Sequence, residues 1–64
     1  MVRQTPEKLL KIGEVALWLN MSRSGVYGLM EAGRLTYVKI GKSRRVPLEA
    51  VKKLVAENTV AATV

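Results

Sequence analysis

The sequence predicts a mainly α-helical domain of three helices with one small β-hairpin, and three observations predict it. Apolar residues recur at helical spacing in Ile12–Leu19 and again in residues 23–32, with a short turn between them. Residues 34–40 then alternate in polarity and are rich in β-branched side chains, which is typical of a strand. After a turn and a second short strand at 44–46, Pro47 begins a third segment of helical periodicity.

The composition restricts the chemistry that this chain can perform. With 64 residues we expect one domain, residues 1–64, with its core at about 9–57 and a tail at 58–64. The absence of cysteine and histidine excludes disulfides and Cys/His zinc sites, and we expect no metal and no cofactor. Aspartate is also absent, the glutamates are scattered, and no glycine motif suits a phosphate, so we expect no catalytic residues and no enzyme.

The charge indicates a polyanionic partner. The net charge is +6 and the isoelectric point is about 10.2. For so short a chain, double-stranded DNA is the first candidate and an anionic membrane surface the second. Because no apolar run is long enough to span a bilayer or to act as a secretory signal, we expect no membrane association and a cytoplasmic location.

The second predicted helix carries the first group of candidate DNA-binding residues. Ser22 is a suitable N-cap, and Gly33 is placed to end the helix in a left-handed conformation. The outer face is small or polar and has a basic residue in its first turn, which suits a DNA groove. The candidates from this pattern are Arg23, Ser24 and Gly28. The alternative is a surface helix of any small globular protein.

The predicted hairpin carries the second group. Between residues 34 and 45 there are five basic residues and no acidic one. A narrow minor groove attracts such side chains through its enhanced negative potential. The candidates here are Lys39, Lys42, Ser43, Arg44 and Arg45. A basic hairpin that follows two such helices is a wing, so the predicted fold is a winged helix-turn-helix with a two-stranded wing. The alternative is an edge hairpin made soluble by its charge.

Two apolar residues fall outside the predicted core stripe of the first helix. Leu17 and Trp18 lie opposite or beside it and form a small apolar patch. One interpretation is that they pack against the chain termini, and the other is that they contact another protein, for example a second copy on DNA.

Other expectations concern packing. The predicted core contributors before and within the first helix are Leu9, Leu10, Ile12, Val15, Ala16 and Leu19. Those of the third helix are Leu48, Val51, Leu54 and Val55. We expect Glu49 to pair with Lys53 four residues later, and Thr5-Pro6-Glu7 to cap a short helical turn.

The pattern of the chain also resembles a known family. The residues that carry the resemblance are Ile12-Gly13-Glu14-Val15-Ala16, Ser22-Arg23-Ser24 with Val26-Tyr27, Gly33-Arg34-Leu35, Val38-Lys39-Ile40-Gly41-Lys42 and Arg45-Val46-Pro47. Over residues 9–56 the chain resembles the excisionase-type branch of the MerR-like winged helix-turn-helix domains, in particular the excisionases of temperate phages, which are recombination directionality factors.

The resemblance implies an architectural DNA-binding protein without catalytic activity. Such a protein binds and bends DNA beside phage attachment sites and directs the integrase toward prophage excision. Its second helix enters the major groove and its wing contacts the adjacent minor groove. The resemblance therefore implies DNA-binding roles for Ser22, Arg23, Ser24 and Tyr27 at the groove-facing start of the helix and for Lys39, Lys42, Arg44 and Arg45 on the wing. Small phage and plasmid transcriptional regulators share the pattern and remain an alternative. A protein-interaction module that uses Leu17 and Trp18 is a third possibility, from another functional class.

The departures from the family pattern predict weak sequence discrimination. Gly28 and Glu31 stand where basic residues are frequent, and Lys11 stands where Ser or Thr usually caps the first helix. Base-edge contacts give specificity, whereas phosphate contacts give affinity alone. We therefore expect specificity to come from DNA shape, from several copies bound side by side, or from the integrase.

Overall fold

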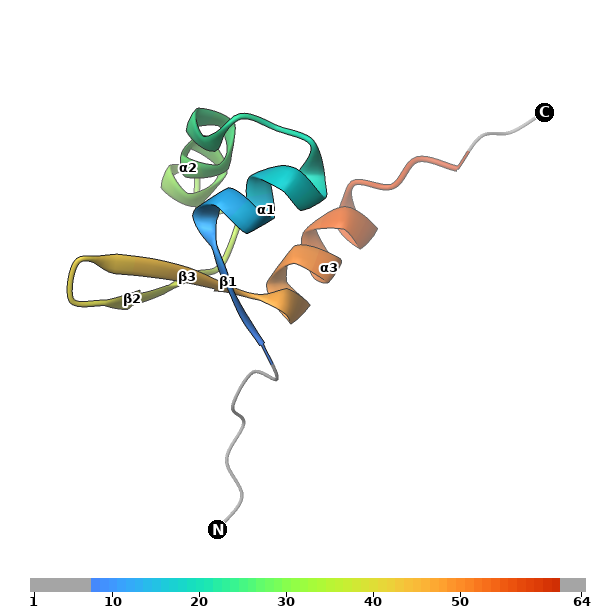
Figure 1. Ribbon diagram of the computed structural model, residues 1–64. Coiled ribbons are helices and arrows are strands. Elements are labelled where there is room, and N and C mark those ends of the chain that lie inside the picture. Colours follow the sequence, from blue (N-terminus) through green and yellow to red (C-terminus); the bar gives the residue numbers. More distant parts are fainter. Residues whose placement is uncertain (1–7, 62–64) are drawn as a thin grey trace, which may run out of the picture.

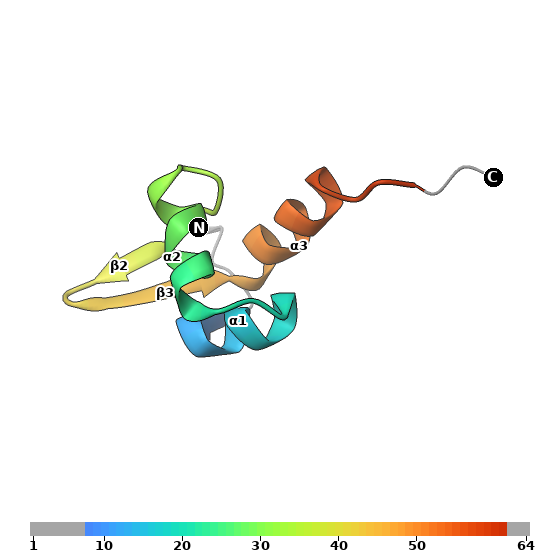
Figure 2. The same cartoon turned by 90° about the horizontal axis from the view of Figure 1, so that it is seen from above.

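The computed structural model describes residues 8–61 and has the architecture of a winged helix-turn-helix (Figure 1). Its elements in chain order are β1 (Leu9–Lys11), α1 (Ile12–Leu19), α2 (Arg23–Glu31), β2 (Val38–Ile40), β3 (Ser43–Pro47) and α3 (Leu48–Glu57). The helices α1 and α2 lie beside one end of a small antiparallel sheet. The β2–β3 hairpin extends away from the helices in both views (Figures 1 and 2). The predicted fold class is confirmed.

Hydrogen bonds at its two ends define α1. Lys11 has no side-chain oxygen for capping, but its N–H donates to Glu14 Oε1 at 2.8 Å, which is half of a capping box. Asn20 takes a left-handed conformation with φ 55°. The Met21 N–H then reaches back to the Ala16 carbonyl at 2.9 Å. The chain thereby reverses within three residues, and α2 begins beside α1.

Helix α2 begins and ends as the sequence predicts. Ser22 Oγ accepts a hydrogen bond from the Gly25 N–H at 3.1 Å. Gly33 has φ 73°, its N–H donates to the Met30 carbonyl at 3.0 Å, and the Arg34 N–H donates to the Leu29 carbonyl at 2.9 Å. These two bonds form a Schellman motif, which satisfies the last carbonyl groups of the helix.

The sheet has three strands in the order β1-β3-β2, all antiparallel, rather than the predicted hairpin alone. Leu10 of β1 lies opposite Val46 of β3, and both side chains are buried. Three residues are too few to show an alternating pattern, so β1 gave no signal in the sequence. The predicted strand at 34–40 is also too long, since β2 contains only Val38–Ile40.

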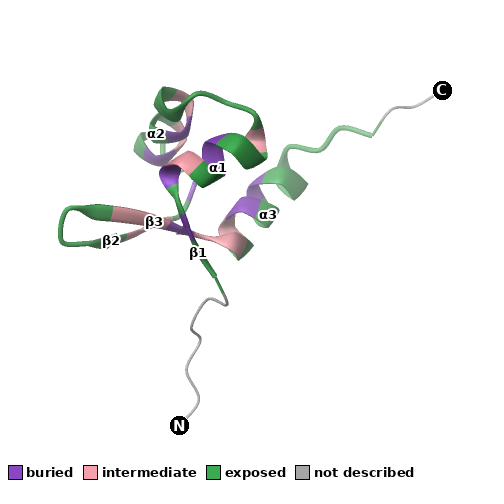
Figure 3. Ribbon diagram, in the orientation of Figure 1, coloured by how far each residue is buried: buried purple, intermediate pink, exposed green. Residues whose placement is uncertain are grey.

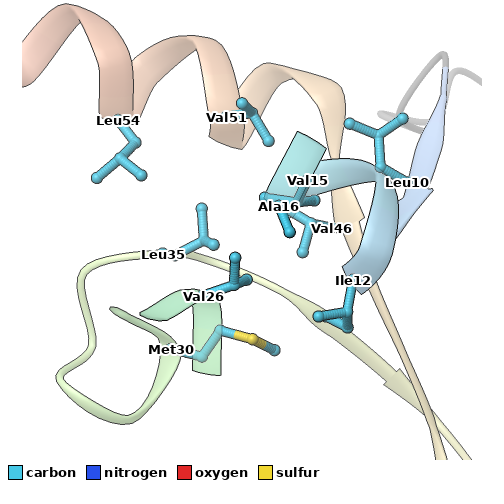
Figure 4. Packing of buried hydrophobic residues seen from close by; sticks show 10 residues of the cluster. All are labelled: Leu10, Ile12, Val15, Ala16, Val26, Met30, Leu35, Val46, Val51 and Leu54. Carbon is cyan, nitrogen blue, oxygen red and sulfur yellow. The ribbon is translucent and has the colours of Figure 1, made fainter. Parts of the chain in front are cut away.

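One small core joins the three helices with β1 and β3 (Figure 4). Its most buried side chains are Leu10, Val15, Val26, Val46 and Val51. Ile12, Ala16, Met30, Leu35 and Leu54 complete it. Because each helix and two of the strands contribute, the orientation of α2 relative to the sheet depends on packing that is remote in sequence.

Two side chains that the sequence predicts in the core are exposed. Leu9 is 38% exposed, because its partner in the sheet is Pro47 on the face that alternates away from Leu10. Val55 is 49% exposed, because the stripe of α3 that reaches the core is narrow and contains Val51 and Leu54. Figure 3 shows that the end of α3 extends away from the core.

The surface of α3 also differs from the sequence prediction. Glu49 Oε2 lies 4.0 Å from Lys52 Nζ, three residues along the helix, and the predicted partner Lys53 does not pair with it. Leu48 is half-buried rather than part of the buried stripe.

Some predictions concern residues outside 8–61. The capped turn predicted at Thr5-Pro6-Glu7 and the last residues of the predicted tail, 62–64, are outside the described part of the chain. Among the described residues, no helix has the length and apolar character that crossing a membrane requires.

Candidate nucleic-acid interface

An open groove of about 850 Å³ separates the start of α1, the start of α2 and the wing, which is the β2–β3 hairpin of residues 38–47. Five cationic side chains line this basic groove. They are Lys11, Arg23, Lys42, Arg44 and Arg45. Glu14 is the acidic residue in its lining, and that carboxylate already accepts the Lys11 N–H. The groove therefore has a strong positive excess and suits a polyanion.

Arg23 lies across the beginning of α1 rather than extending freely from α2. A Cβ atom built on Gly13 would lie 2.7 Å from Arg23 Nη2 and 3.3 Å from Arg23 Cζ. A side chain at position 13 would consequently displace the guanidinium. The glycine allows Arg23 to lie along the wall of the groove, where it is exposed.

The remaining candidates on α2 form a shallow surface. Ser24 and Gly28 are exposed, and no atom lies within 4 Å of a Cβ built on Gly28. Tyr27 is 42% exposed, and Ser22 is exposed while its hydroxyl caps the helix. This face presents few long donors to a ligand, as its sequence predicts.

The tip of the wing is the most accessible cationic part of the hairpin. Lys39, Lys42 and Ser43 are exposed, and Gly41 forms the turn with φ 61°. The end of the β2–β3 hairpin is coloured as exposed in Figure 3. Ile40 lies opposite Ser43 and is 59% exposed. Nothing in the described structure pairs with the two lysines, so their ammonium groups are available to a ligand.

Arg44, by contrast, is enclosed. Its Cζ lies 5.4 Å from the centre of the Tyr27 ring and 5.1 Å from the centre of the Tyr37 ring. Its Nη1 lies 3.7 Å from Glu31 Oε2, and its side chain is 25% exposed. Four residues from three parts of the chain thus form one cluster, which we call the arginine clamp (Tyr27, Glu31, Tyr37 and Arg44). Sequence reasoning did not find Tyr37 or this cluster.

Two other arginines of the basic run have partners within the protein. Arg34 Nη2 donates to Asn58 Oδ1 at 3.0 Å, which connects the end of α2 with the end of α3. Arg45 is half-buried, and its Nη1 donates to the carbonyl of Arg44 at 2.9 Å. The five basic residues between positions 34 and 45 therefore differ in how available they are to a ligand. Lys11, which the sequence analysis did not select, lies opposite Arg45 in the sheet and joins the groove.

The apolar patch on α1 is exposed. Leu17 is 82% and Trp18 is 60% exposed. The interpretation that they pack against the chain termini concerns residues 1–7 and 62–64, which lie outside the described part of the chain. Leu17 also forms part of the rim of the basic groove.

Comparison with known proteins gives the family. Residues 9–59 match the model of a helix-turn-helix domain family. The chain is 42% identical over 57 residues to a protein named excisionase from Streptomyces ambofaciens, a match that covers 89% of this chain and 90% of the relative. No solved structure matches significantly. Membership of this family of DNA-binding proteins confirms the expectation that the chain is not an enzyme. The chain belongs to the excisionase-type helix-turn-helix proteins.

Proposed function

We propose that this protein is an excisionase, an architectural factor that binds and bends attachment-site DNA and directs an integrase toward prophage excision. The observation that carries the proposal is the basic groove, in which cations of β1, α2 and the wing face one space beside a helix-turn-helix. The match to a relative named excisionase over nearly the whole chain supports the excision role. The protein would act in the host cytoplasm, bound to DNA.

In this proposal α2 enters the major groove and the wing follows the adjacent minor groove. Ser24, Tyr27 and Gly28 would face base edges, and Lys39 and Lys42 would bind phosphates. The phosphate contacts of the two lysines would supply affinity without sequence information. Because the exposed face of α2 is poor in long donors, a single copy would discriminate weakly between sequences.

Several copies side by side would compensate for weak reading by one copy. A chain of 64 residues covers a short stretch of duplex, at the small end of protein–DNA interfaces. The exposed Leu17 and Trp18 provide an apolar surface for contact between neighbouring copies. We propose that the protein is monomeric when free and binds cooperatively to adjacent sites, bending the DNA at flexible pyrimidine–purine steps.

The test is footprinting on the attachment region of the parent element, with and without its integrase, together with an excision assay. We expect protection of adjacent sites beside the integrase core site, and excision that depends on this protein. Protection confined to a promoter, with altered transcription in the absence of integrase and no effect on excision, would favour a transcriptional regulator instead. If the protein binds no duplex, the remaining hypothesis is a protein-interaction module that contacts its partner through Leu17 and Trp18.

A further inference from the structure

Arg44 lies between two aromatic rings that belong to different parts of the chain. Tyr27 is on α2, and Tyr37 directly precedes β2 and packs against the core. Both ring centres are within 6 Å of the guanidinium carbon, which is the range of a cation–π interaction. The side chain of Arg44 therefore connects the wing with the helix that the proposed function places in the major groove.

Glu31 holds the same guanidinium from a third side. It lies one helical turn after Tyr27 on the same face of α2, at the i,i+4 spacing. Nη1 of Arg44 is shielded from solvent, donates no hydrogen bond in the described structure, and faces Glu31 Oε2 at 3.7 Å. In this arrangement a large part of the Arg44 charge is directed at α2 and not outward to a ligand.

The register of the sheet explains how the clamp affects the tip of the wing. Arg44 lies two residues before Val46 of the core, so both side chains are on the same face of β3. Arg44 also lies directly opposite Lys39 of β2. The backbone of Arg44 is thus part of a strand that is anchored in the core. The neighbouring strand, β2, carries the exposed wing lysine Lys39. A change in the position of Arg44 would move the hairpin relative to α2.

We propose that Arg44 is a positioning residue, which sets the angle between the wing and α2 so that Lys39 and Lys42 meet the DNA backbone while α2 occupies the major groove. This inference rests on the proposed function for the DNA contacts themselves. The planar guanidinium is necessary because it stacks on aromatic faces, whereas a lysine ammonium is a compact point charge. Arg44 is accordingly not interchangeable with lysine, although a simple phosphate contact would be.

The experiment measures the salt dependence of binding to a fluorescent random-sequence 30-base-pair duplex. Tyr37→Leu removes one ring of the clamp and no charge, while Tyr37→Phe is the matched control that keeps the ring. Arg44→Lys keeps the charge and loses the planar group. We expect Tyr37→Leu and Arg44→Lys each to weaken binding about threefold to tenfold, and to reduce the log–log salt slope by about 0.9 for each wing lysine that loses its phosphate. Tyr37→Phe should bind like the wild type.

The same substitutions are then made in a variant that lacks the two wing lysines, to test whether the clamp acts through the wing. In the variant Lys39→Ala/Lys42→Ala, neither Tyr37→Leu nor Arg44→Lys should reduce the slope further, because the contacts that the clamp positions are already absent. In the free protein, the Arg44 side-chain proton signals should carry ring-current shifts that Tyr37→Leu reduces and Tyr37→Phe preserves. The dispersion of the amide signals in the same NMR spectra verifies that each variant, Arg44→Lys included, is folded.

The results separate the inference from the proposed function. If Arg44→Lys keeps both affinity and slope while Tyr37→Leu binds like the wild type, Arg44 is a direct phosphate contact and the inference is wrong. If the slope falls on Tyr37→Leu equally with and without the two wing lysines, the clamp does not act through the wing and the inference is also wrong. If the wild type itself shows no salt-dependent binding, the proposed function fails at its first step.

Discussion

Glu31 on α2 and Arg44 on β3 form an ion pair across the junction of helix and wing, with Oε2 and Nη1 3.7 Å apart. An acidic residue on the helix proposed to enter the major groove opposes DNA binding, because it faces a dense row of phosphates. The pair gives Glu31 a role inside the protein, since its carboxylate compensates a guanidinium that two tyrosines enclose.

We expect Glu31→Gln to increase affinity for any duplex, because one negative charge leaves the DNA-facing helix. Since the Glu31 side chain is 71% exposed, the loss of the ion pair should change the free energy of unfolding by less than about 1 kcal/mol. Glu49→Gln on α3 is the matched control and should leave binding nearly unchanged. Fluorescence anisotropy at low and high salt measures both variants. An affinity that falls in Glu31→Gln would mean that the ion pair matters more for positioning than its charge costs in binding.

A substitution at Gly28 separates an effect on the stability of the fold from an effect on DNA contact. No atom lies within 4 Å of a Cβ at this position, so Gly28→Ala should raise the free energy of unfolding by about 1 kcal/mol in urea titrations. Gly33→Ala is the control and should lower it, because φ is 73° there. If DNA approaches the backbone of α2 at Gly28, the stabilised Gly28→Ala variant should also bind more weakly. If the DNA affinity of Gly28→Ala is unchanged, Gly28 does not lie in the DNA interface.

Arg23 is expected to bind a phosphate rather than a base edge, because its guanidinium lies along the start of α1 over Gly13. Arg23→Ala should weaken binding to specific and random duplexes equally and reduce the salt slope by about 0.9. Gly13→Ala displaces the guanidinium without removing its charge, and should weaken binding on both duplexes as well. A loss confined to the specific site, of about 1–3 kcal/mol, would instead show that Arg23 reads a base.

The two wing lysines should account for a defined part of the salt dependence. Lys39→Ala/Lys42→Ala should reduce the log–log slope by about 1.8, since each lost phosphate contact contributes about 0.9. Lys52→Ala/Lys53→Ala removes the same charge from α3, where both side chains are exposed, and should change the slope much less. Equal effects of the two double variants would indicate that net charge alone, and not the wing, determines binding.

The apolar patch on α1 predicts cooperative binding. In a gel titration on DNA with one, two and three sites, the wild type should fill adjacent sites together, and Leu17→Ser/Trp18→Ser should fill them independently. Removal of residues 59–64 tests the tail as the alternative contact surface. Circularisation of the three-site DNA measures bending. Independent filling by the wild type, with no change in circularisation, would contradict the proposals of cooperativity and of bending.

The sequence predicted the elements that local signals specify. Ser22 and Gly33 define both ends of α2, and the apolar periodicity of residues 12–19 defines α1, because capping bonds and helical spacing involve residues only a few positions apart. The exposed wing tip with Lys39 and Lys42 was predictable for the same reason. A turn glycine and alternating polarity are local properties, and the tip of a hairpin has nothing to pack against.

Only the tertiary structure decided which cations are free. Arg34, Arg44 and Lys42 look alike in the basic run, yet Arg34 binds Asn58 and Arg44 lies between two tyrosines, while Lys42 is exposed. The partners of these arginines come from elements distant in sequence. The additional strand is a similar case, since β1 exists because Leu10 lies opposite Val46 in the sheet and both side chains are buried in the core. Charge is a property of the residue, but its availability to DNA depends on the packing of the whole chain.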